Sequence, residues 1–341
     1  MIDFYLNHLN LSSSDLQKVN LSDNFKNQGK KIIYIVKPIN KCSFFQKKIN
    51  ALRKEIKDEQ YLVFRFQTLQ GRIRRIEKKK TRFIAKIQVG LEFLIFRLIP
   101  RLIVFRKIYA YLSNETILIL SKAEGLGRIV YGGFDIERVE SSVSYNYVLA
   151  SPSDKIYSSK KPSFGPIYGM PRIGKNGKII TVFKIRTMHP YSEFLHEYIL
   201  KHNGYGEKGK PNNDFRVTSW GRVLRKYWID EIPQLFNVLK GELKLVGLRP
   251  VSEVYFNELG EEYRNMRINY KPGCIPPYVA LNKKPSKEEV IEAEHEYIKM
   301  KKSSPYTTDI ILFFRALTNI IAFNKRGTWR NYFYSFLHLV L

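Results

Sequence analysis

Residues 222–250 read RVLRKYWIDEIPQLFNVLKGELKLVGLRP, a stretch that holds two adjacent carboxylates, Asp230 and Glu231. Four basic side chains flank this pair: Arg222, Arg225, Lys226 and Arg249. Two carboxylates within so much positive charge can coordinate a divalent metal ion and present a nucleophile to a phosphate ester. The stretch is therefore the first candidate for chemistry in the chain, and it also predicts the local fold of that site.

Two short helices are predicted here. Thr218 or Ser219 can cap the first, WGRVLRKYW (220–228), which places three of the basic side chains on one face at i, i+3 and i+4. The second is DEIPQLFNVLK, with Asp230 as its N-cap and with Pro233 tolerated in the first turn, where amide groups lack an intrahelical partner. The positive end of that helix dipole would keep the carboxylates ionised and favour an anionic substrate beside them.

The charge balance points to polyanionic partners. The chain has 341 residues, with 58 Lys and Arg against 31 Asp and Glu, which gives a formal net charge of +27. Nucleotide phosphates, anionic lipid headgroups and nucleic acid all fit such a charge. The length exceeds that of one average core, so we expect a catalytic domain with an accessory region.

The cysteines and the apolar segments of the sequence indicate in which cell compartment the protein works. Cys42 and Cys274 lie far apart and form no CxxC or Cys/His cluster, so neither a disulfide framework nor a structural zinc site is indicated. A reducing, cytoplasmic setting fits best. The first residues lack the features of a secretory signal, and no uncharged apolar run reaches the roughly 18 to 20 residues of a membrane-spanning helix. Any membrane contact is expected on one face of the bilayer.

Residues 1–160 are predicted to form a small mixed α/β accessory region. Its strands are expected at 31–36, 61–66, 135–141 and 145–151, and its helices at 44–56 and 121–134. A long basic helical stretch, 71–112, interrupts them. Residues 151–163 have the Ser, Pro and Lys content of a linker and mark the domain boundary.

Within that basic stretch, residues 89–112 mix apolar and aromatic residues with four basic ones. Pro100 should break or kink a helix there, because it removes a backbone donor. One interpretation is an interfacial or re-entrant helix pair whose arginines reach anionic headgroups. The other is an amphipathic core helix of the N-terminal region, broken at the proline.

Residues 161–325 are predicted to form a helix-rich catalytic domain. Residues 172–188, RIGKNGKIITVFKIRTM, indicate a β-hairpin, because Asn176-Gly177 is a strong turn signal before a β-branched and aromatic strand. A short helix should follow at 189–202. The predicted fold class is therefore α+β: a helix-rich domain with a small hairpin and interfacial amphipathic helices, preceded by a small mixed α/β domain.

The C-terminal region adds one more amphipathic segment. Residues 307–331 carry apolar residues at helical spacing with Arg315, Lys325 and Arg326 among them. An interfacial helix explains this pattern, and a core helix is the alternative. Residues 326–341 are predicted to form an apolar tail.

Three segments give the sequence a specific resemblance. They are GPIYGMPRIGKNGKIITVFKIRTM (165–188), DFRVTSWGRVLRKYWIDEIPQLFNVLKGELKLVGLRP (214–250) and YKPG (270–273). Through them, residues 164–325 resemble the bacterial sugar transferase family, the monotopic phosphoglycosyl transferases. These enzymes move a sugar phosphate from a nucleotide sugar onto a polyprenyl phosphate. The resemblance covers roughly half of the chain.

The resemblance implies a role for each matching residue. Asp230 would be the nucleophile that attacks the sugar-linked phosphate of a UDP-sugar, releasing UMP and leaving a phosphosugar on the aspartate. Glu231 would complete the dyad, and the two carboxylates would hold Mg²⁺. Arg225 matches a phosphate-binding arginine, and Arg249 matches the arginine of a Pro-Arg-Pro element near the nucleotide. The other substrate-binding residues implied are Lys184, Arg186, Arg216 and Arg222. A polyprenyl phosphate would then attack the intermediate and regenerate Asp230.

Several positions depart from the family pattern. Leu248 replaces the first proline of Pro-Arg-Pro, and Glu242 stands where Asp is usual, which can alter the geometry on the nucleotide side. The sequence KPGCIPP differs from the commoner Lys-Pro-Gly-x-Thr-Gly. The family usually places a re-entrant helix just before the Gly-Pro element, whereas the only candidate here, 89–112, lies well upstream.

The resemblance implies an enzyme at the cytoplasmic face of the bacterial inner membrane that begins surface glycan or exopolysaccharide assembly. Its partners would be a UDP-sugar donor, a polyprenyl (undecaprenyl) phosphate acceptor and an anionic membrane surface. The competing hypothesis is a basic module that binds a membrane or nucleic acid without catalysis, in which Asp230 and Glu231 only cap a helix. The sequence carries no RNP-like, zinc-finger or helix-turn-helix signature, so nucleic acid is not an expected partner.

Overall fold

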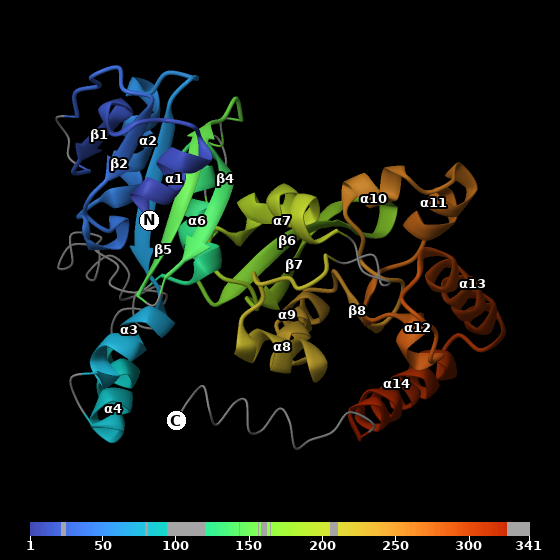
Figure 1. Ribbon diagram of the computed structural model, residues 1–341. Coiled ribbons are helices and arrows are strands. Elements are labelled where there is room, and N and C mark those ends of the chain that lie inside the picture. The colour runs from blue at the N-terminus through green and yellow to red at the C-terminus, as the bar shows by residue number, and fades with distance from the viewer. Residues whose placement is uncertain are drawn as a thin grey trace.

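The fold combines a five-stranded α/β unit with a helix-rich region that contains two small sheets (Figure 1). A computed structural model describes residues 1–21, 25–78, 81–93, 120–142, 144–155, 157, 162–163, 165–204 and 211–325. Most of the predicted segment 89–112 and the whole predicted tail 326–341 lie outside these residues. The predicted α+β class is confirmed.

The N-terminal unit is built on a sheet with the strand order β1-β2-β3-β5-β4. The strands are β1 (Leu16–Val19), β2 (Ile32–Ile35), β3 (Tyr61–Gln67), β4 (Phe134–Ser141) and β5 (Tyr145–Pro152). The first three run parallel, whereas β5 is antiparallel to β3 and β4. β2 is buried along its whole length, which explains its unbroken apolar sequence IIYI. All four predicted strands are confirmed.

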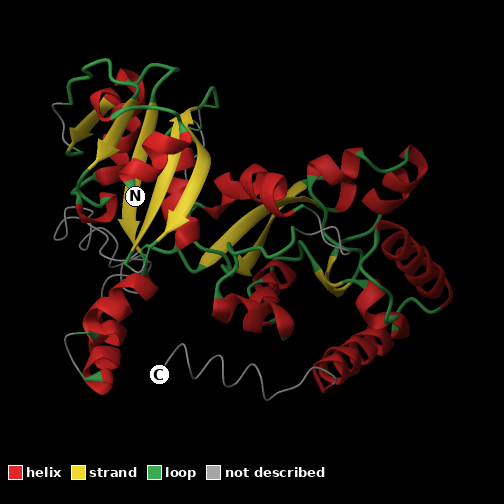
Figure 2. Ribbon diagram, viewed as in Figure 1, coloured by secondary structure: helices red, strands yellow, loops and turns green. Residues whose placement is uncertain are grey.

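Helices cover both faces of this sheet (Figure 2). They are α1 (Ile2–His8), α2 (Phe45–Glu55) and α6 (Lys122–Tyr131), with the 3₁₀ helices η1 (Ser13–Asp15) and η2 (Ile39–Lys41). Successive side chains of a strand point to opposite faces. Ile33 and Phe64 therefore join the larger core under α2 and α6, while Ile32 and Val63 pack with α1. The helices predicted at 44–56 and 121–134 are confirmed.

Two helices leave the end of β3 and project away from the sheet (Figure 1). They are α3 (Leu69–Glu77) and α4 (Arg82–Phe93). Thr68 caps α3, because its side chain accepts a hydrogen bond from the backbone of Gly71 at 3.2 Å. The single helical stretch predicted from residue 71 is therefore wrong in its described part, where two separate helices stand. One side of α4 exposes four apolar side chains: Phe83, Ile84, Ile87 and Leu91.

The helix-rich region contains a β-hairpin and a second pair of strands. The hairpin strands are β6 (Ile167–Ile173) and β7 (Ile179–Ile185), and β8 (Lys244–Val246) pairs in parallel with β9 (Gly273–Ile275). The helices are α7 (His196–Asn203), α8 (Ser219–Lys226), α9 (Gln234–Leu239), α10 (Glu253–Asn257), α11 (Glu261–Ile268), α12 (Pro277–Ala280), α13 (Lys287–Ser303) and α14 (Thr307–Lys325). Three 3₁₀ helices complete it: η5 (Lys175–Gly177), η6 (Ser192–Leu195) and η7 (Ile229–Glu231). The hairpin turns where predicted, with Asn176 at φ 58°.

The sheet unit and the helix-rich region share one core. The main apolar cluster includes Tyr191, Phe194 and Leu195, which follow the hairpin, together with residues of α2, α6 and the sheet. Gly127 of α6 allows the contact, since a Cβ there would lie 2.2 Å from the carbonyl oxygen of Tyr191. Packing therefore continues across the predicted linker, and the division into 1–160 and 161–325 stays a prediction.

The C-terminal helices form a second core of their own. Leu312 and Ala316 of α14 are fully buried against Ala280 of α12 and Tyr297 of α13. The other side of α14 exposes apolar side chains as well: Ile310, Ile311, Phe314 and Leu317. The core interpretation therefore holds for the buried side of α14, and the interfacial interpretation of its exposed side stays a prediction. Among the described residues, no helix combines the length and the apolar character that crossing a bilayer requires.

Candidate active site

A cavity of about 490 Å³ lies between the β6-β7 hairpin, the segment from α8 to α9, and the chain that follows β8 and β9. Seven of the residues predicted for the site line it: Lys184, Arg186, Arg216, Arg225, Asp230, Glu231 and Arg249. The eighth, Arg222, is exposed on α8 and is not among the described residues that line the cavity. The fold thus brings together side chains that are up to 65 positions apart, from Lys184 to Arg249.

Helix α8 is anchored at the end of the hairpin. Thr218 caps it as predicted, accepting from the backbone of Gly221 at 2.9 Å and donating to the carbonyl of Thr187 at 3.0 Å. Gly221 packs directly on the hairpin, because a Cβ there would lie 2.2 Å from the same carbonyl oxygen. This close contact directs Arg225 toward Thr187, whose hydroxyl accepts from the Arg225 Nε at 2.8 Å.

Asp230 lies in the 3₁₀ helix η7, after Trp228 in the left-handed region at φ 59°. The predicted helix over 230–240 with Asp230 as N-cap is wrong: α9 begins only at Gln234. The reason is Pro233, which has no N–H to bond the carbonyl of residue 229, so i→i+3 hydrogen bonds replace the helical ones on both sides. The dipole of a long helix therefore does not act on this carboxylate.

Asp230 is only 7% exposed as a residue, and it lines the cavity. Within the described part of the chain it makes no hydrogen bond or ion pair, and the nearby guanidinium of Arg225 is coupled to it electrostatically. Buried carboxylate oxygens are normally paired. Asp230 therefore holds free acceptor capacity at the wall of the cavity.

Glu231 is held from two sides. Lys184 of β7 forms an ion pair with one carboxylate oxygen, and Gln234 of α9 donates to the other. Burial raises the pKa of Glu231 above its ordinary value, and the Lys184 ammonium opposes that shift. Asn237 fixes α9 to the hairpin by donating to the carbonyl of Thr181 at 2.8 Å. Hairpin and dyad are thus one rigid assembly.

Two of the arginines differ in how many donors they keep free. Arg186 donates to the carbonyl of Gly165 at 2.8 Å and to the hydroxyl of Ser163 at 3.1 Å, while its buried Nη2 has no partner. Arg216 instead forms a bidentate pair with Asp214, with both bonds at 2.8 Å. Arg186 is therefore suited to an anionic ligand, whereas Arg216 is largely engaged within the protein.

Sequence reasoning missed several lining residues on the hairpin. Tyr168, Met170 and Arg172 of β6 line the cavity beside Lys184 of β7, and Tyr168 is paired directly with Lys184. All of them lie on one face, because side chains of a strand alternate with a period of two. Every second residue back from Lys184 along β7, together with its partner across the hairpin on β6, would have identified them. Tyr278, after β9, had no such signal.

Cys274 also lines the cavity, but its chemistry excludes it as a nucleophile. Burial, together with the nearby charge of Glu231, raises the pKa of the Cys274 thiol to about 12. The thiolate is the reactive form of cysteine, and at neutral pH this thiol stays protonated. Cys274 is therefore a weaker candidate for attack than the carboxylates of the cavity.

The charges around the cavity suit a phosphorylated ligand. Its described lining includes six cationic side chains, Arg172, Lys184, Arg186, Arg216, Arg225 and Arg249, and three acidic ones, Glu193, Asp230 and Glu231. No group of three or more His, Cys, Asp or Glu side chains in the described residues could hold a metal ion alone. Two adjacent carboxylates nevertheless fit magnesium, which binds one or two carboxylates together with substrate phosphates.

The chain is similar to known sugar transferases. The model of the bacterial sugar transferase family matches residues 155–322. Undecaprenyl-phosphate galactose phosphotransferase of Salmonella typhimurium is 44% identical over 93 residues, 26% of this chain and 20% of that protein. UDP-N-acetylgalactosamine-undecaprenyl-phosphate N-acetylgalactosaminephosphotransferase of Aeromonas hydrophila is 29% identical over 171 residues, 48% of this chain and 37% of that protein. Exopolysaccharide production protein ExoY of Rhizobium meliloti is 45% identical over 91 residues, 25% of this chain and 40% of that protein.

Through residues 155–322 the chain belongs to the bacterial sugar transferase family, which confirms the resemblance seen in the sequence. The aligned part spans between about a fifth and two fifths of the length of these three relatives. The N-terminal sheet unit lies almost entirely before the family match.

Proposed function

We propose that the protein transfers a sugar 1-phosphate from a UDP-sugar to a polyprenyl phosphate through a covalent intermediate on Asp230, with release of UMP. The observation that supports this most is the free acceptor capacity of Asp230 inside a mostly cationic cavity. A carboxylate that no protein group engages can attack phosphorus, and the surrounding cations offset the repulsion between the two anions. The transfer would begin assembly of a surface glycan or exopolysaccharide.

The reaction divides into two displacements at one phosphorus. An oxygen of Asp230 attacks the phosphorus that carries the sugar, the bond to the bridging diphosphate oxygen breaks, and UMP leaves with its electron pair. An oxygen of the polyprenyl phosphate then attacks the same phosphorus, and the Asp230 carboxylate leaves. Each step exchanges one P–O bond for another, so the balance requires no further reactant.

The cationic side chains would bind the oxygens that do not react. The terminal nitrogens of Arg225 make no hydrogen bond within the described residues, and the unpaired Nη2 of Arg186 is a buried donor that an anionic oxygen would satisfy. Arg249, exposed at the cavity near the ring of Tyr278, would bind the nucleotide side. Lys184 acts through Glu231, which it holds in place.

Asp230 and Glu231 are the residues that would hold a magnesium ion. Bound there, the ion would neutralise charge on phosphate oxygens of the donor. Glu231 suits this role because its position is fixed by Lys184 and Gln234. Its raised pKa reflects a buried carboxylate that gains from a nearby cation.

We further propose that the protein docks on an anionic membrane surface, at the cytoplasmic face of the inner membrane. Helix α9 and the residue just after the dyad expose an apolar stripe at helical spacing: Ile232, which precedes the helix, and Leu235, Phe236 and Leu239 on it. The exposed apolar sides of α4 and α14 described above add to it, and all three helices lie in the lower half of the view in Figure 1. Together with the net charge of +27, these stripes suit a surface of apolar chains and anionic headgroups.

The decisive experiment measures UMP release from the purified full-length chain with magnesium, polyprenyl phosphate and a panel of UDP-sugars that includes UDP-galactose and UDP-N-acetylgalactosamine. We expect Asp230→Asn to lower the rate at least about a thousandfold, because the amide is a poor nucleophile. Asp154→Asn, an exposed acid-to-amide change outside the cavity, should retain wild-type activity.

The intermediate gives a second readout. Wild-type protein mixed with donor alone should gain the mass of one sugar phosphate, and Asp230→Asn should not. A fully active Asp230→Asn variant would reject the assigned nucleophile. If no UDP-sugar in the panel gives UMP while the protein binds anionic vesicles or DNA in a salt-sensitive manner, the basic binding module without catalysis is the better explanation.

A further inference from the structure

Glu294 of α13 is a fully buried carboxylate that contacts the chain at Arg249. It accepts a hydrogen bond from the backbone N–H of Arg249 at 2.9 Å, and it forms an ion pair with the buried Arg267 of α11. Arg267 in turn donates to the carbonyl oxygen of Arg249. The hydroxyl of Tyr263 also donates a hydrogen bond to the Glu294 carboxylate. Both polar backbone groups of Arg249 are therefore held by one buried ion pair.

Such a pair is an inefficient way to stabilise a core. Removing two charges from water offsets most of their mutual attraction, and apolar residues of similar volume are often as stable. A buried pair does, however, supply strongly directional donors and acceptors. Because those donors and acceptors here end on the main chain of Arg249, their effect is to fix the backbone from which its guanidinium reaches the cavity.

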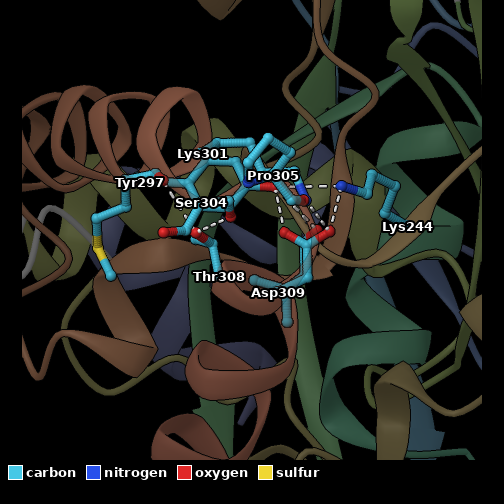
Figure 3. A network of polar contacts seen from close by, with 9 residues as sticks. Lys244, Tyr297, Lys301, Ser304, Pro305, Thr308 and Asp309 are labelled. Atoms are coloured by element: carbon cyan, nitrogen blue, oxygen red, sulfur yellow. Dashed lines mark hydrogen bonds and ion pairs between the residues drawn. The ribbon is translucent and has the colours of Figure 1, made fainter.

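The same face of α13 also fixes the strand that leads to Arg249. Tyr297 and Lys301 follow Glu294 at i+3 and i+7, and both contact Asp309, at 2.8 Å each. Lys244, the first residue of β8, forms an ion pair with Asp309 as well. Figure 3 shows these side chains converging on the Asp309 carboxylate. Helix α13 thus holds the segment from Lys244 to Arg249 at both ends, at Arg249 through Glu294 and at Lys244 through Asp309 of α14.

We propose that Glu294 and Arg267 are positioning residues that set Arg249 for binding the nucleotide phosphates of the donor. The inference rests on the function proposed for Arg249. Neither residue lines the cavity, so both would act only through the Arg249 backbone. Loss of this contact should weaken donor binding and leave the attack by Asp230 unchanged once the donor is bound.

The test is a double-mutant cycle on nucleotide binding. Dissociation constants for UMP and UDP-galactose are measured by calorimetry with full-length protein that carries Asp230→Asn, so turnover plays no part. Arg267→Lys keeps the charge beside Glu294 but loses the planar donor to Arg249. We expect it to weaken binding about tenfold, the worth of a charged hydrogen bond. In an Arg249→Ala background the same change should have no further effect.

Two variants separate positioning from mere stability. Tyr263→Phe removes one donor to Glu294 but leaves both bonds to Arg249, so it should lower the melting temperature without changing nucleotide affinity. Arg264→Lys, on the same helix and without a contact to Arg249, should change neither. If Arg267→Lys does not fold, Glu294→Gln takes its place in the cycle.

Three outcomes overturn the inference: unchanged affinity in a folded Arg267→Lys protein, an equal loss in the Arg249→Ala background, and an equal loss in Tyr263→Phe. Absence of nucleotide binding to the parent protein would also overturn it. Failure of the proposed function looks different, because it leaves wild-type protein without UMP release whatever the outcome of the binding cycle.

Discussion

Glu231 illustrates how a single residue in this site balances opposing influences. Burial favours its neutral form, and the ammonium of Lys184 favours its ionised form, with burial the larger of the two. The resulting pKa lies above the ordinary value for glutamate. In the proposed function the Lys184 ammonium therefore matters, because it favours the ionised form of Glu231 that would hold a metal ion and that pairs with the hairpin.

The pH dependence of activity should reveal this balance. Lys184→Met removes the cation that lowers the Glu231 pKa, so the pKa rises further and protonation begins at higher pH. We expect the acidic limb of the kcat/KM profile for the donor to move to higher pH, in addition to a lower plateau. Lys178→Met, at the exposed hairpin turn, should leave the limb in place. A lower plateau with an unmoved limb would show that Lys184 does not control Glu231.

At the scale of elements, α9 carries two properties on one short helix. Its inner side is fixed to the hairpin through Asn237, and its outer side exposes the apolar stripe. Because α9 follows η7 directly, a membrane that contacts the stripe would lie next to Asp230. This arrangement would let a lipid phosphate reach the carboxylate while its polyprenyl chain stays in the bilayer.

Substitution on the stripe tests that arrangement. Leu235→Asp replaces an exposed apolar side chain with an anion, which loses apolar burial and adds repulsion from anionic headgroups. We expect binding to phosphatidylglycerol vesicles to weaken by at least about tenfold in a sedimentation assay. Val254→Asp is the matched control, because Val254 is more exposed than Leu235 but lies on α10, above and to the right of α9 in Figure 1. Equal losses in the two variants would argue against a specific docking face.

At the scale of the whole molecule, the sheet unit is joined to the transferase region through packing as well as through the chain. Helix α6 contacts η6, and Ser192 and Glu193 of η6 line the cavity. Arg128 of α6 also lies over the ring of Tyr191, 4.2 Å from its centroid. The N-terminal unit therefore supports one wall of the site.

A single added methyl group should disturb this junction. Gly127→Ala places a Cβ 2.2 Å from the Tyr191 carbonyl oxygen, so α6 and η6 must separate. We expect a loss of about 1–3 kcal/mol in the free energy of unfolding, measured by urea denaturation, together with reduced UMP release. Gly90→Ala on α4, where a Cβ meets nothing within 4 Å, should be neutral or slightly stabilising. If Gly127→Ala keeps the wild-type free energy of unfolding, α6 and η6 can separate without loss of stability, and the close contact is not required.

Local patterns in the sequence determined most of the elements. The apolar runs of β2 and β3, the periodic pattern of α2, the Asn176-Gly177 turn and the Thr218 cap all form as predicted. Each depends on residues within a few positions of one another, and such interactions are encoded locally. The ordered motifs likewise identified the family and seven residues of the cavity.

Only the tertiary structure decided how those residues work together. Pro233 displaced the helix that was expected at Asp230. The hairpin face added Arg172 and Tyr168 to the lining of the cavity, and Glu294 of α13 fixed the backbone of Arg249 by a hydrogen bond. The sequence likewise did not predict that residues on both sides of the predicted linker share one core. These features depend on contacts between segments far apart in the chain, and packing rather than local periodicity selects them.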